Sequence, residues 1–540
     1  MNNRLRTFVA GAVGMVVAFG MVELMHGLYQ PIPSVLVAVA QRIIELTPGG
    51  FATRAIEILG KADIPVLITV VVVSTLLLAG FLAHLSLRSP VIALIGVSIL
   101  AAVALAASLI EPFAAPVATV LTVLGALGLG GAVTTFLLYA PGLQTLGSMS
   151  RPESPKSSRE PRVRSVRKKE AHSSAGIAVN RRNFLVLSGS ATLAGLAATG
   201  VGRTLAGGGE QEASNAASSK SGLSLANKTL PAPPPEASLD VPGMPPLITP
   251  AEDFYLIDTA LSSPRINVDT WRLNVKGAID NPIELTYNDL LSMPTREADI
   301  TLSCVSNEVG GELISNGRWT GVLLSDVLKE AGVSRDKISR ASKQLVGRSV
   351  DGWTAGFKTD VALDGREALV AFGLNDDELP LKHGYPVRLV VPGLYGYVSA
   401  TKWLTEIELT DWDFDAYWIQ RTWSKEGPIQ TQSRIDTVKD GESLSAGTVQ
   451  VGGVAWAPHR GIDRVEVSTD DGETWTNAKL AAQLAADTWR QYVHNWEARP
   501  GDYTLKVRAT DGEGKTQTED EAAPHPSGAT GYHTIQVTVA

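Results

Sequence analysis

The segment His383-Gly384-Tyr385-Pro386-Val387-Arg388-Leu389-Val390-Val391-Pro392-Gly393 carries the clearest fold signal of this chain. Its middle part, Val387–Val391, is rich in β-branched residues and has a proline on each side, as expected for a short buried strand. Strands of the same kind are expected at Trp271–Ile279, Leu345–Ser349 and Ala368–Phe372. Short helices are expected at Leu285–Leu291, where Thr286 can act as the cap, and at Leu323–Ala331. This mixture predicts an α+β domain.

The pattern changes toward the C-terminus, where strand signals replace the mixed pattern. Strands are expected at Thr448–Val454, Arg464–Ser468, Tyr503–Ala509 and Tyr532–Val539. The tight turn Asp470-Asp471-Gly472 lies between two of the strand-forming stretches. Short strands at this spacing predict an all-β sandwich of about 100 residues.

Cys304 is the single cysteine of the chain, so neither an intrachain disulfide nor a zinc-finger cluster can form. It ends the strand-like run Ile300–Ser303. A buried inert thiol is the commonest state of such a residue. A thiolate bound to a transition metal would also be protected from oxidation. A catalytic nucleophile is the third interpretation, although the sequence shows no obvious histidine partner.

Several segments together resemble the sulfite oxidase superfamily of molybdopterin enzymes. They are Phe254–Thr259, Cys304–Asn307, Arg318–Leu324, the His383–Gly393 segment and Lys402-Trp403-Leu404. Val467–Trp475 is similar to the immunoglobulin-like dimerisation domain of that family. The resemblance covers about residues 250–540 and not the preceding half.

This resemblance implies a sulfite-oxidase-like α+β molybdopterin domain at 251–425. It also implies an immunoglobulin-like sandwich at 426–540, through which the chain can form a homodimer. The implied cofactor is molybdenum–molybdopterin, with Cys304 as the metal ligand. The implied cofactor contacts are Ile257, Asp258, Thr259, Ala260, Ser349 (or, by a shifted alignment, Asp351), His383, Arg388, Ala400, Thr401 and Lys402. Arginine and lysine suit an anionic phosphate, as a forked donor and a point charge respectively.

The residues expected around the substrate depart from the pattern of sulfite-oxidising members. Those members place arginines just after the cysteine, where this chain has Asn307 and Glu308. Their active-site tyrosine corresponds here to Trp423. We therefore take Cys304, Asn307 and Trp423 as the catalytic candidates. An oxyanion needs fixed cationic donors, so an uncharged S- or N-oxide fits better than sulfite, although Arg421 could supply a charge.

Three functions remain open at this stage. The first is a membrane-anchored molybdenum oxidoreductase that acts on a small neutral oxide and exchanges electrons with a membrane carrier or another redox partner. The second is a sulfite oxidase or dehydrogenase. The third is a non-catalytic binding protein displayed on the membrane. The net charge of −8 gives no case for a nucleic-acid partner.

The first 150 residues predict a helical membrane bundle. The chain is 44% hydrophobic and 19% charged, and its long apolar runs are concentrated here. Four spans in the lipid bilayer are expected at Phe8–Tyr29, Ile64–Leu85, Pro90–Ile110 and Pro116–Tyr139. Ser34–Leu46 is too short and too polar to span, and is expected to be interfacial or re-entrant. His26 and His84 lie near opposite ends of spans and do not suggest a haem pair, so an anchor or docking role is expected for the bundle.

A basic stretch at 151–183 follows and is expected on the cytoplasmic side. Asn180-Arg181-Arg182-Asn183-Phe184-Leu185 resembles a twin-arginine export signal, although an arginine pair also occurs by chance in basic loops. The weakly apolar segment 184–206 would then be a fifth span that carries the rest of the chain out of the cytoplasm. It has no clear cleavage site and is expected to remain as an anchor. Residues 207–250, rich in Gly, Ser and Pro, are expected to form an extended linker without a core.

Overall fold

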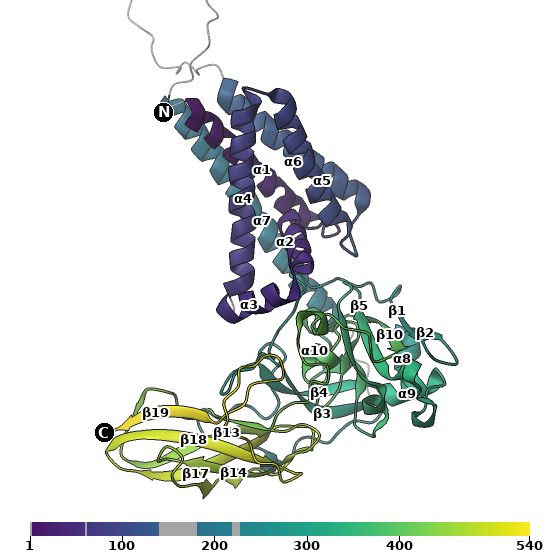
Figure 1. Ribbon diagram of the computed structural model, residues 1–540, viewed down its shortest axis with the longest axis vertical. Helices are drawn as coiled ribbons and strands as arrows, with labels where there is room; N and C mark the ends of the chain where they lie inside the picture. Colours follow the sequence, from purple (N-terminus) through teal and green to yellow (C-terminus); the bar gives the residue numbers. More distant parts are fainter. Residues whose placement is uncertain (1–2, 60–61, 140–180, 219–226) are drawn as a thin grey trace, which may run out of the picture. The chain divides into compact units, whose positions relative to one another are not determined.

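The computed structural model describes residues 3–59, 62–139, 181–218 and 227–540 (Figure 1). These residues form two compact units, 1–43 with 62–208 and 44–61 with 209–540. Most of the basic stretch expected at 151–183 lies outside the described residues.

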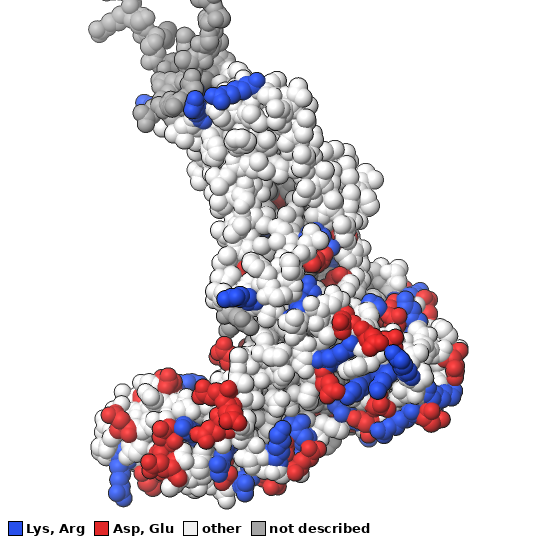
Figure 2. Space-filling view, viewed as in Figure 1, with Lys and Arg blue, Asp and Glu red and all other residues white. Residues whose placement is uncertain are grey.

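The N-terminal part of the chain is helical. Its elements are α1 (Asn3–Leu28), α2 (Val35–Leu46), α3 (Gly49–Leu59), α4 (Asp63–Ser86), α5 (Pro90–Leu109), α6 (Pro116–Tyr139) and α7 (Arg181–Ser218). Within the described residues, five helices are long and apolar enough to cross a membrane, and they coincide with the five expected segments. The bent pair of α2 and α3, with 116° between the two helices, would be a sixth if it counts as one span. The flank of these helices seen in Figure 2 is almost free of charged residues, which suits a lipid environment.

Helix α7 packs closely on α1 through glycine. A Cβ atom on Gly20 would lie 2.3 Å from the carbonyl oxygen of Gly195, and one on Gly27 would lie 2.3 Å from that of Gly202. Small residues at such crossings let two helix backbones approach each other. The buried Glu23 of α1 accepts a hydrogen bond from the Ser34 hydroxyl at 2.5 Å and lies 3.7 Å from the Arg203 guanidinium of α7. Segment 184–206 is therefore an integral part of this unit.

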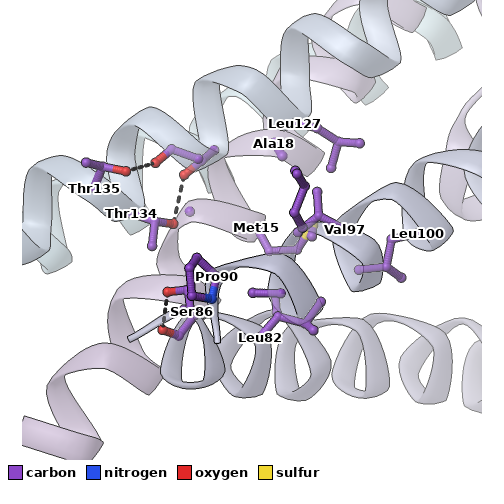
Figure 3. A pocket seen from close by; sticks show the side chains of 18 residues that line it. Met15, Ala18, Leu82, Ser86, Pro90, Val97, Leu100, Leu127, Thr134 and Thr135 are labelled. Carbon is purple, nitrogen blue, oxygen red and sulfur yellow. Dashed lines mark hydrogen bonds between the residues drawn. The ribbon is translucent and has the colours of Figure 1, made fainter. Parts of the chain in front are cut away.

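An apolar cavity of about 320 Å³ lies among α1, α4, α5 and α6. Figure 3 shows Met15, Leu82, Val97 and Leu127 at its wall, with hydroxyl groups such as that of Thr134 at one end. The Thr134 hydroxyl donates to the Gly130 carbonyl at 2.8 Å. The cavity thus has an almost wholly apolar lining.

The next part of the chain forms two sheets. The first sheet has the order β2-β1-β10-β5-β6, and the second has the order β3-β4-β7-β8 with β9 beside β7. The strands are β1 (Arg272–Gly277), β2 (Ile283–Thr286), β3 (Thr295–Ser303), β4 (Ile314–Leu323), β5 (Gln344–Ser349), β6 (Thr354–Lys358), β7 (Leu369–Leu374), β8 (Asp377–Glu378), β9 (Arg388–Val390) and β10 (Leu404–Thr410). Short helices α8 (Tyr287–Ser292), α9 (Leu324–Glu330) and α10 (Gly396–Ser399) connect them. The expected strands are confirmed as β1, β5, β7 and β9.

The first expected helix begins where the sequence predicts. The Thr286 hydroxyl accepts the Asp289 backbone N–H, and the Asp289 carboxylate accepts the Thr286 N–H, which makes a full capping box. Apolar side chains from both sheets then fill one core, in which Leu273, Val370 and Leu389 are completely buried. This core holds β9, and with it the His383–Gly393 segment, in a fixed position.

The C-terminal residues form two further sheets. Their orders are β11-β13-β17-β16 and β12-β19-β18-β14-β15. The strands are β11 (Gln432–Ile435), β12 (Glu442–Leu444), β13 (Gly447–Trp456), β14 (Ile462–Ser468), β15 (Thr476–Asn477), β16 (Lys479–Leu480), β17 (Arg490–Ala498), β18 (Gly501–Asp511) and β19 (His533–Val539). Val451 and Tyr492 from one sheet and Val507 from the other share a second core. The all-β prediction is confirmed, while the immunoglobulin-like assignment stays a prediction.

The expectation of an unpacked linker at 207–250 was wrong in two places. Helix α7 continues to Ser218, beyond the expected end of the fifth span. Residues 227–250 pack on the two-sheet domains, where Ala237 and Leu247 join the first core. The backbone N–H of Leu239 donates to the Gln491 side chain at 2.6 Å. Prolines restrict the unfolded chain and so reduce the entropy lost when such an extended segment docks. The composition of the segment alone does not reveal that it docks.

Candidate active site

Cys304 directly follows β3 and begins a tight loop. Its backbone N–H donates to the Leu313 carbonyl at 3.0 Å, and its own carbonyl accepts the Asn307 N–H at 3.1 Å. The residue is buried, and burial raises the pKa of its thiol, while hydrogen bonds from Ser306 to the sulfur act in the opposite direction. A buried thiol with donors at its sulfur becomes a stable thiolate only when a cation accompanies it. This environment fits a metal ligand.

The two residues expected beside Cys304 differ in their roles. Asn307 is buried, and its Oδ1 accepts the Leu313 N–H at 2.8 Å, which closes the loop. Its Nδ2 is buried with no partner among the described residues, so a donor remains for a ligand. Glu308 is exposed. It does not form part of the buried lining of this loop.

Arg388 and His383 of the fold-determining segment form one cluster. The Arg388 guanidinium donates to the His383 carbonyl at 2.9 Å and lies 5.0 Å from the ring centre of Trp319. Burial lowers the pKa of Arg388 to about 10. Burial also lowers the pKa of His383 to about 3, so its ring is neutral. Because a carbonyl can only accept, His383 Nε2 donates to Ala251 at 3.0 Å and leaves Nδ1 as an acceptor.

Lys402 and Asp258 also belong to this cluster, although Asp258 lies far ahead of His383 in the sequence and Lys402 lies after Arg388. Their side chains form an ion pair, and Lys402 Nζ also donates to the Lys382 carbonyl at 2.8 Å. Burial raises the pKa of Asp258 and lowers that of Lys402 to about 8. Gly384 has φ +114°, and a Cβ there would lie 3.0 Å from the Lys402 Cβ and 3.1 Å from the Arg388 Cβ. Glycine is therefore required where the two cations converge.

Two buried hydroxyl groups near this cluster have no hydrogen-bond partner among the described residues. They are Ser349 Oγ and Thr401 Oγ1. Thr401 lies beside β9, since its carbonyl accepts the Leu389 N–H at 2.9 Å. Ser349 pairs with Leu404 across β5 and β10. Unpaired buried hydroxyls are costly, and here they fit the hydrogen-bonding edge of a polar cofactor.

The other expected cofactor contacts are less buried. Ile257 is 50% exposed, and Thr259, Ala260 and Ala400 are half-buried. Such residues can hold a ligand through their backbone groups. The shifted alternative, Asp351, lies close enough to Lys402 for its charge to act on that amine.

Trp423 lies in an aromatic cluster that follows the left-handed residue Thr422 (φ 72°). Its ring stacks on Trp418 at 4.0 Å between ring centres and meets the edge of Tyr397 at 5.2 Å. Its buried Nε1 has no hydrogen-bond partner among the described residues. The ring is thus fixed by its neighbours while its donor remains available.

Two further residues near Trp423 and Cys304, His525 and Ser306, were not among the candidates from the sequence. His525, in the loop between β18 and β19, lies with Nε2 3.0 Å from Ser306 Oγ and with its ring 4.4 Å from that of Trp423. It links Trp423 to the Cys304 loop. Ser306 and His525 are 219 residues apart. The one local signal was the sequence Pro524-His525-Pro526, a histidine set in a rigid turn.

The arginines close to the site are held by other groups. Arg318 makes two hydrogen bonds of 2.9 Å to the Asp299 carboxylate. Arg434 donates to Asp436 at 2.7 Å and to the Gly311 carbonyl at 2.6 Å. Arg421 lies over the ring of Tyr417 at 3.7 Å, and its carbonyl accepts the hydroxyl of Thr53 from α3 at 3.1 Å. Their contacts tie these cations to the protein rather than to the sulfur of Cys304.

Comparison with known proteins agrees with this geometry. Residues 260–418 match the model of the oxidoreductase molybdopterin binding domain. Residues 425–522 match the model of the Mo-co oxidoreductase dimerisation domain. Human mitochondrial sulfite oxidase is 30% identical over 323 residues, which cover 51% of this chain and 58% of that protein. Residues 260–522 belong to the sulfite oxidase superfamily.

Other similar proteins have lower sequence identity. Arabidopsis thaliana nitrate reductase [NADH] 1 is 25% identical over 287 residues, which cover 44% of this chain and 31% of that protein. The sulfane dehydrogenase SoxCD from Paracoccus pantotrophus is 23% identical with a TM-score of 0.48, over 57% of this chain and 84% of that chain. This chain spans about half the length of the mammalian relatives, 58% for the human protein and 52% for the rat protein. By the match to the family model, residues 260–418 are a molybdopterin-binding oxidoreductase domain.

Proposed function

We propose that this chain is a membrane-anchored molybdopterin-dependent oxidoreductase that acts outside the cytoplasm on a small uncharged S- or N-oxide. The observation that carries the proposal is that a buried thiol at Cys304, the Asp258–Lys402–Arg388–His383 cluster and Trp423 all lie within residues 258–423. The location outside the cytoplasm is inferred from the export-like segment at the start of α7, and the membrane anchor is inferred from the apolar helices.

The residues present fit the cofactor that the superfamily binds. Arg388 and Lys402 supply positive charge for its phosphate, and that anion would offset the burial that lowers the pKa of Lys402 to about 8. Ser349 and Thr401 supply the unpaired hydroxyls, and His383 Nδ1 supplies an acceptor. Cys304 would hold the molybdenum. When bound, the group supplies oxygen-atom and two-electron transfer.

The preference for a neutral substrate rests on the charges around Cys304. Asn307 and Trp423 offer neutral N–H donors, and Arg318 and Arg434 are paired with carboxylates. An oxyanion would have to leave water without a cation to replace its hydration. An uncharged oxide has an acceptor oxygen and a smaller desolvation cost. In its reduction the S–O or N–O bond breaks, the heteroatom gains two electrons that a membrane electron carrier or another redox partner supplies, and the oxygen leaves as water with two protons from solvent.

A sulfite oxidase or dehydrogenase is the second candidate, because mitochondrial sulfite oxidases are among the similar proteins, the human one at 30% identity and the rat one at 31%. Arg421 is the cation that could serve sulfite, if it turned from Tyr417. A homodimer through residues 425–522 is part of the proposal, because that region matches a dimerisation domain.

The test uses the purified full-length protein. We expect molybdenum and pterin in a 1:1 ratio to the chain. With reduced viologen as the electron donor, dimethyl sulfoxide or trimethylamine N-oxide should be reduced. With ferricyanide as the acceptor, sulfite should be oxidised with a lower kcat/KM. Absence of molybdenum and pterin would favour the non-catalytic binding protein, and a higher kcat/KM for sulfite would favour the second candidate.

A further inference from the structure

A side chain from the C-terminal two-sheet domain reaches the Cys304 loop. His525 Nε2 lies 3.0 Å from Ser306 Oγ, and Ser306 stands two residues after Cys304 in the same loop. The contact of Ser306 with His525 therefore connects the loop of the expected metal ligand to a domain whose family match is a dimerisation domain.

The loop that carries His525 is held firmly. The Ser424 backbone N–H, next to Trp423, donates to the Pro526 carbonyl at 3.1 Å. Gly528 has φ +97°, and a Cβ there would lie 2.3 Å from the Tyr395 hydroxyl. Ala522 and Thr530 pair across the base of the loop. A loop fixed at three places keeps the His525 ring in one position against Trp423.

The rings of Trp423 and His525 lie against each other, and the buried Trp423 keeps one donor that has no partner among the described residues. Their ring centres are 4.4 Å apart and the planes are tilted by 32°. Trp423 Nε1 is buried and lacks a partner among the described residues, which is unfavourable unless a ligand accepts its proton. Trp418 and Tyr397 hold the indole in place. A ligand that reaches this pair would find an indole N–H for its oxygen atom and ring carbons beside it for an organic group.

We infer that Trp423 and His525 position an uncharged organic S- or N-oxide, with Trp423 Nε1 donating to the oxide oxygen and His525 bounding the organic substituent. This inference rests on the proposed function. Under it, the C-terminal domain takes part in substrate selection as well as in association of two chains. His525 acts as a positioning residue through Ser306 and Trp423.

The test compares three variants of the full-length protein. Trp423→Phe keeps a ring and removes the N–H, His525→Phe keeps a ring and removes both nitrogens, and His525→Gln keeps a donor for Ser306. For dimethyl sulfoxide we expect KM to rise about five- to tenfold in Trp423→Phe, the size of one lost hydrogen bond, with a smaller change in kcat. His525→Phe should raise KM about threefold or more, and His525→Gln should restore part of the loss. His459→Asn, at a partly exposed histidine of the same domain, is the matched control.

Two readouts separate this inference from a loss of structure and from failure of the proposed function. The ratio of kcat/KM for dimethyl sulfoxide to kcat/KM for sulfite should fall in Trp423→Phe and His525→Phe, with molybdenum content unchanged. Wild-type KM in both variants, or an equal fall for both substrates, would overturn the inference. A wild-type protein that contains molybdenum but reduces no neutral oxide would instead overturn the proposed function. If His525→Phe loses molybdenum, its kinetics are set aside. The ratio of kcat/KM for dimethyl sulfoxide to kcat/KM for sulfite in Trp423→Phe and in His525→Gln then tests the inference.

Discussion

At the scale of single residues, the proposed role of Cys304 as a metal ligand gives the first prediction. Burial raises the pKa of its thiol, so the thiolate needs a cation to balance it. We predict that Cys304→Ser folds, because the proposed cofactor contacts are spread over two sheets, but lowers kcat by more than about a hundredfold. The sulfur-to-metal charge-transfer band should disappear from the visible spectrum. Unchanged turnover and spectrum in this variant would disprove the ligand assignment.

His533 couples stability to pH in the C-terminal domain. Its Nδ1 accepts the Ile435 backbone N–H at 2.9 Å, so the ring must be neutral, and burial lowers its pKa to about 4. Between about pH 6.5 and pH 4 the unfolded chain takes up a proton that the folded chain does not. Stability therefore falls as pH falls through this window. From pH 7 to pH 5 we expect a loss of up to about 2 kcal/mol from this group.

Thermal unfolding of the full-length protein at the two pH values measures this effect. His533→Gln, which keeps an acceptor for the Ile435 N–H, should show a smaller fall in Tm between pH 7 and pH 5. His459→Asn should behave like the wild type, because Asn tolerates the left-handed backbone there (φ 74°). An equal fall in all three proteins would contradict the prediction.

The sequence predicted which charged residues lie together near β9 better than it predicted the neighbours of Trp423. His383, Arg388 and Lys402 lie in two short segments near β9, so their proximity follows from local structure and family resemblance. Ser306 and His525 come together because two domains pack against each other. No periodicity in the sequence encodes such a contact. The unpaired state of Trp423 Nε1 likewise depends on side-chain packing that a sequence does not specify.

At the scale of elements, the contact of α1 with α7 gives a sharp prediction. A Cβ on Gly202 would lie 2.1 Å from the Glu23 carbonyl oxygen, while one on Gly200 meets nothing within 4 Å. Gly202→Ala should therefore destabilise the helical unit by about 1–3 kcal/mol, because neither backbone can yield cheaply. Gly200→Ala should be neutral or slightly stabilising, since alanine favours the helix. Tm in detergent micelles measures both, and equal Tm values would show that the two helices do not pack in this way.

Element types were easier to predict than element ends. The five long apolar helices and the capped start of α8 follow from hydrophobic length and from Thr286. Helix α7 passes through Gly207–Gly209, which we expected to end it. Residues 227–250 pack on a domain because Ala237 and Leu247 meet its core, although their surroundings are rich in proline. Amino-acid composition predicts only the average tendency of a segment to form a helix or to pack. Whether one helix continues, or one proline-rich segment docks, depends on individual contacts.

At the scale of the whole molecule, the helical unit has one basic end. The start of α1 meets the end of α4, where the Thr7 hydroxyl lies 3.2 Å from His84 Nδ1. The start of α7 joins them, with the Arg6 guanidinium 5.1 Å from the ring centre of Phe184. Figure 2 shows Lys and Arg at this end. Positive residues favour the cytoplasmic side, so this end should face the cytoplasm.

That orientation requires α7 to carry residues 227–540 to the opposite side, which leads to a prediction about export. The twin-arginine pathway reads two guanidinium groups, whereas charge-based orientation reads charge alone. Arg181→Lys with Arg182→Lys keeps the charge and should leave the first four helices inserted while the two-sheet domains stay inside. In intact spheroplasts, added protease should digest residues 227–540 of the wild type and spare them in the double variant. Arg4→Lys with Arg6→Lys, which makes the same charge-conserving change outside the signal, should behave like the wild type. If the double variant is digested as fast as the wild type, export does not use the arginine pair and the folded domain crosses by another route.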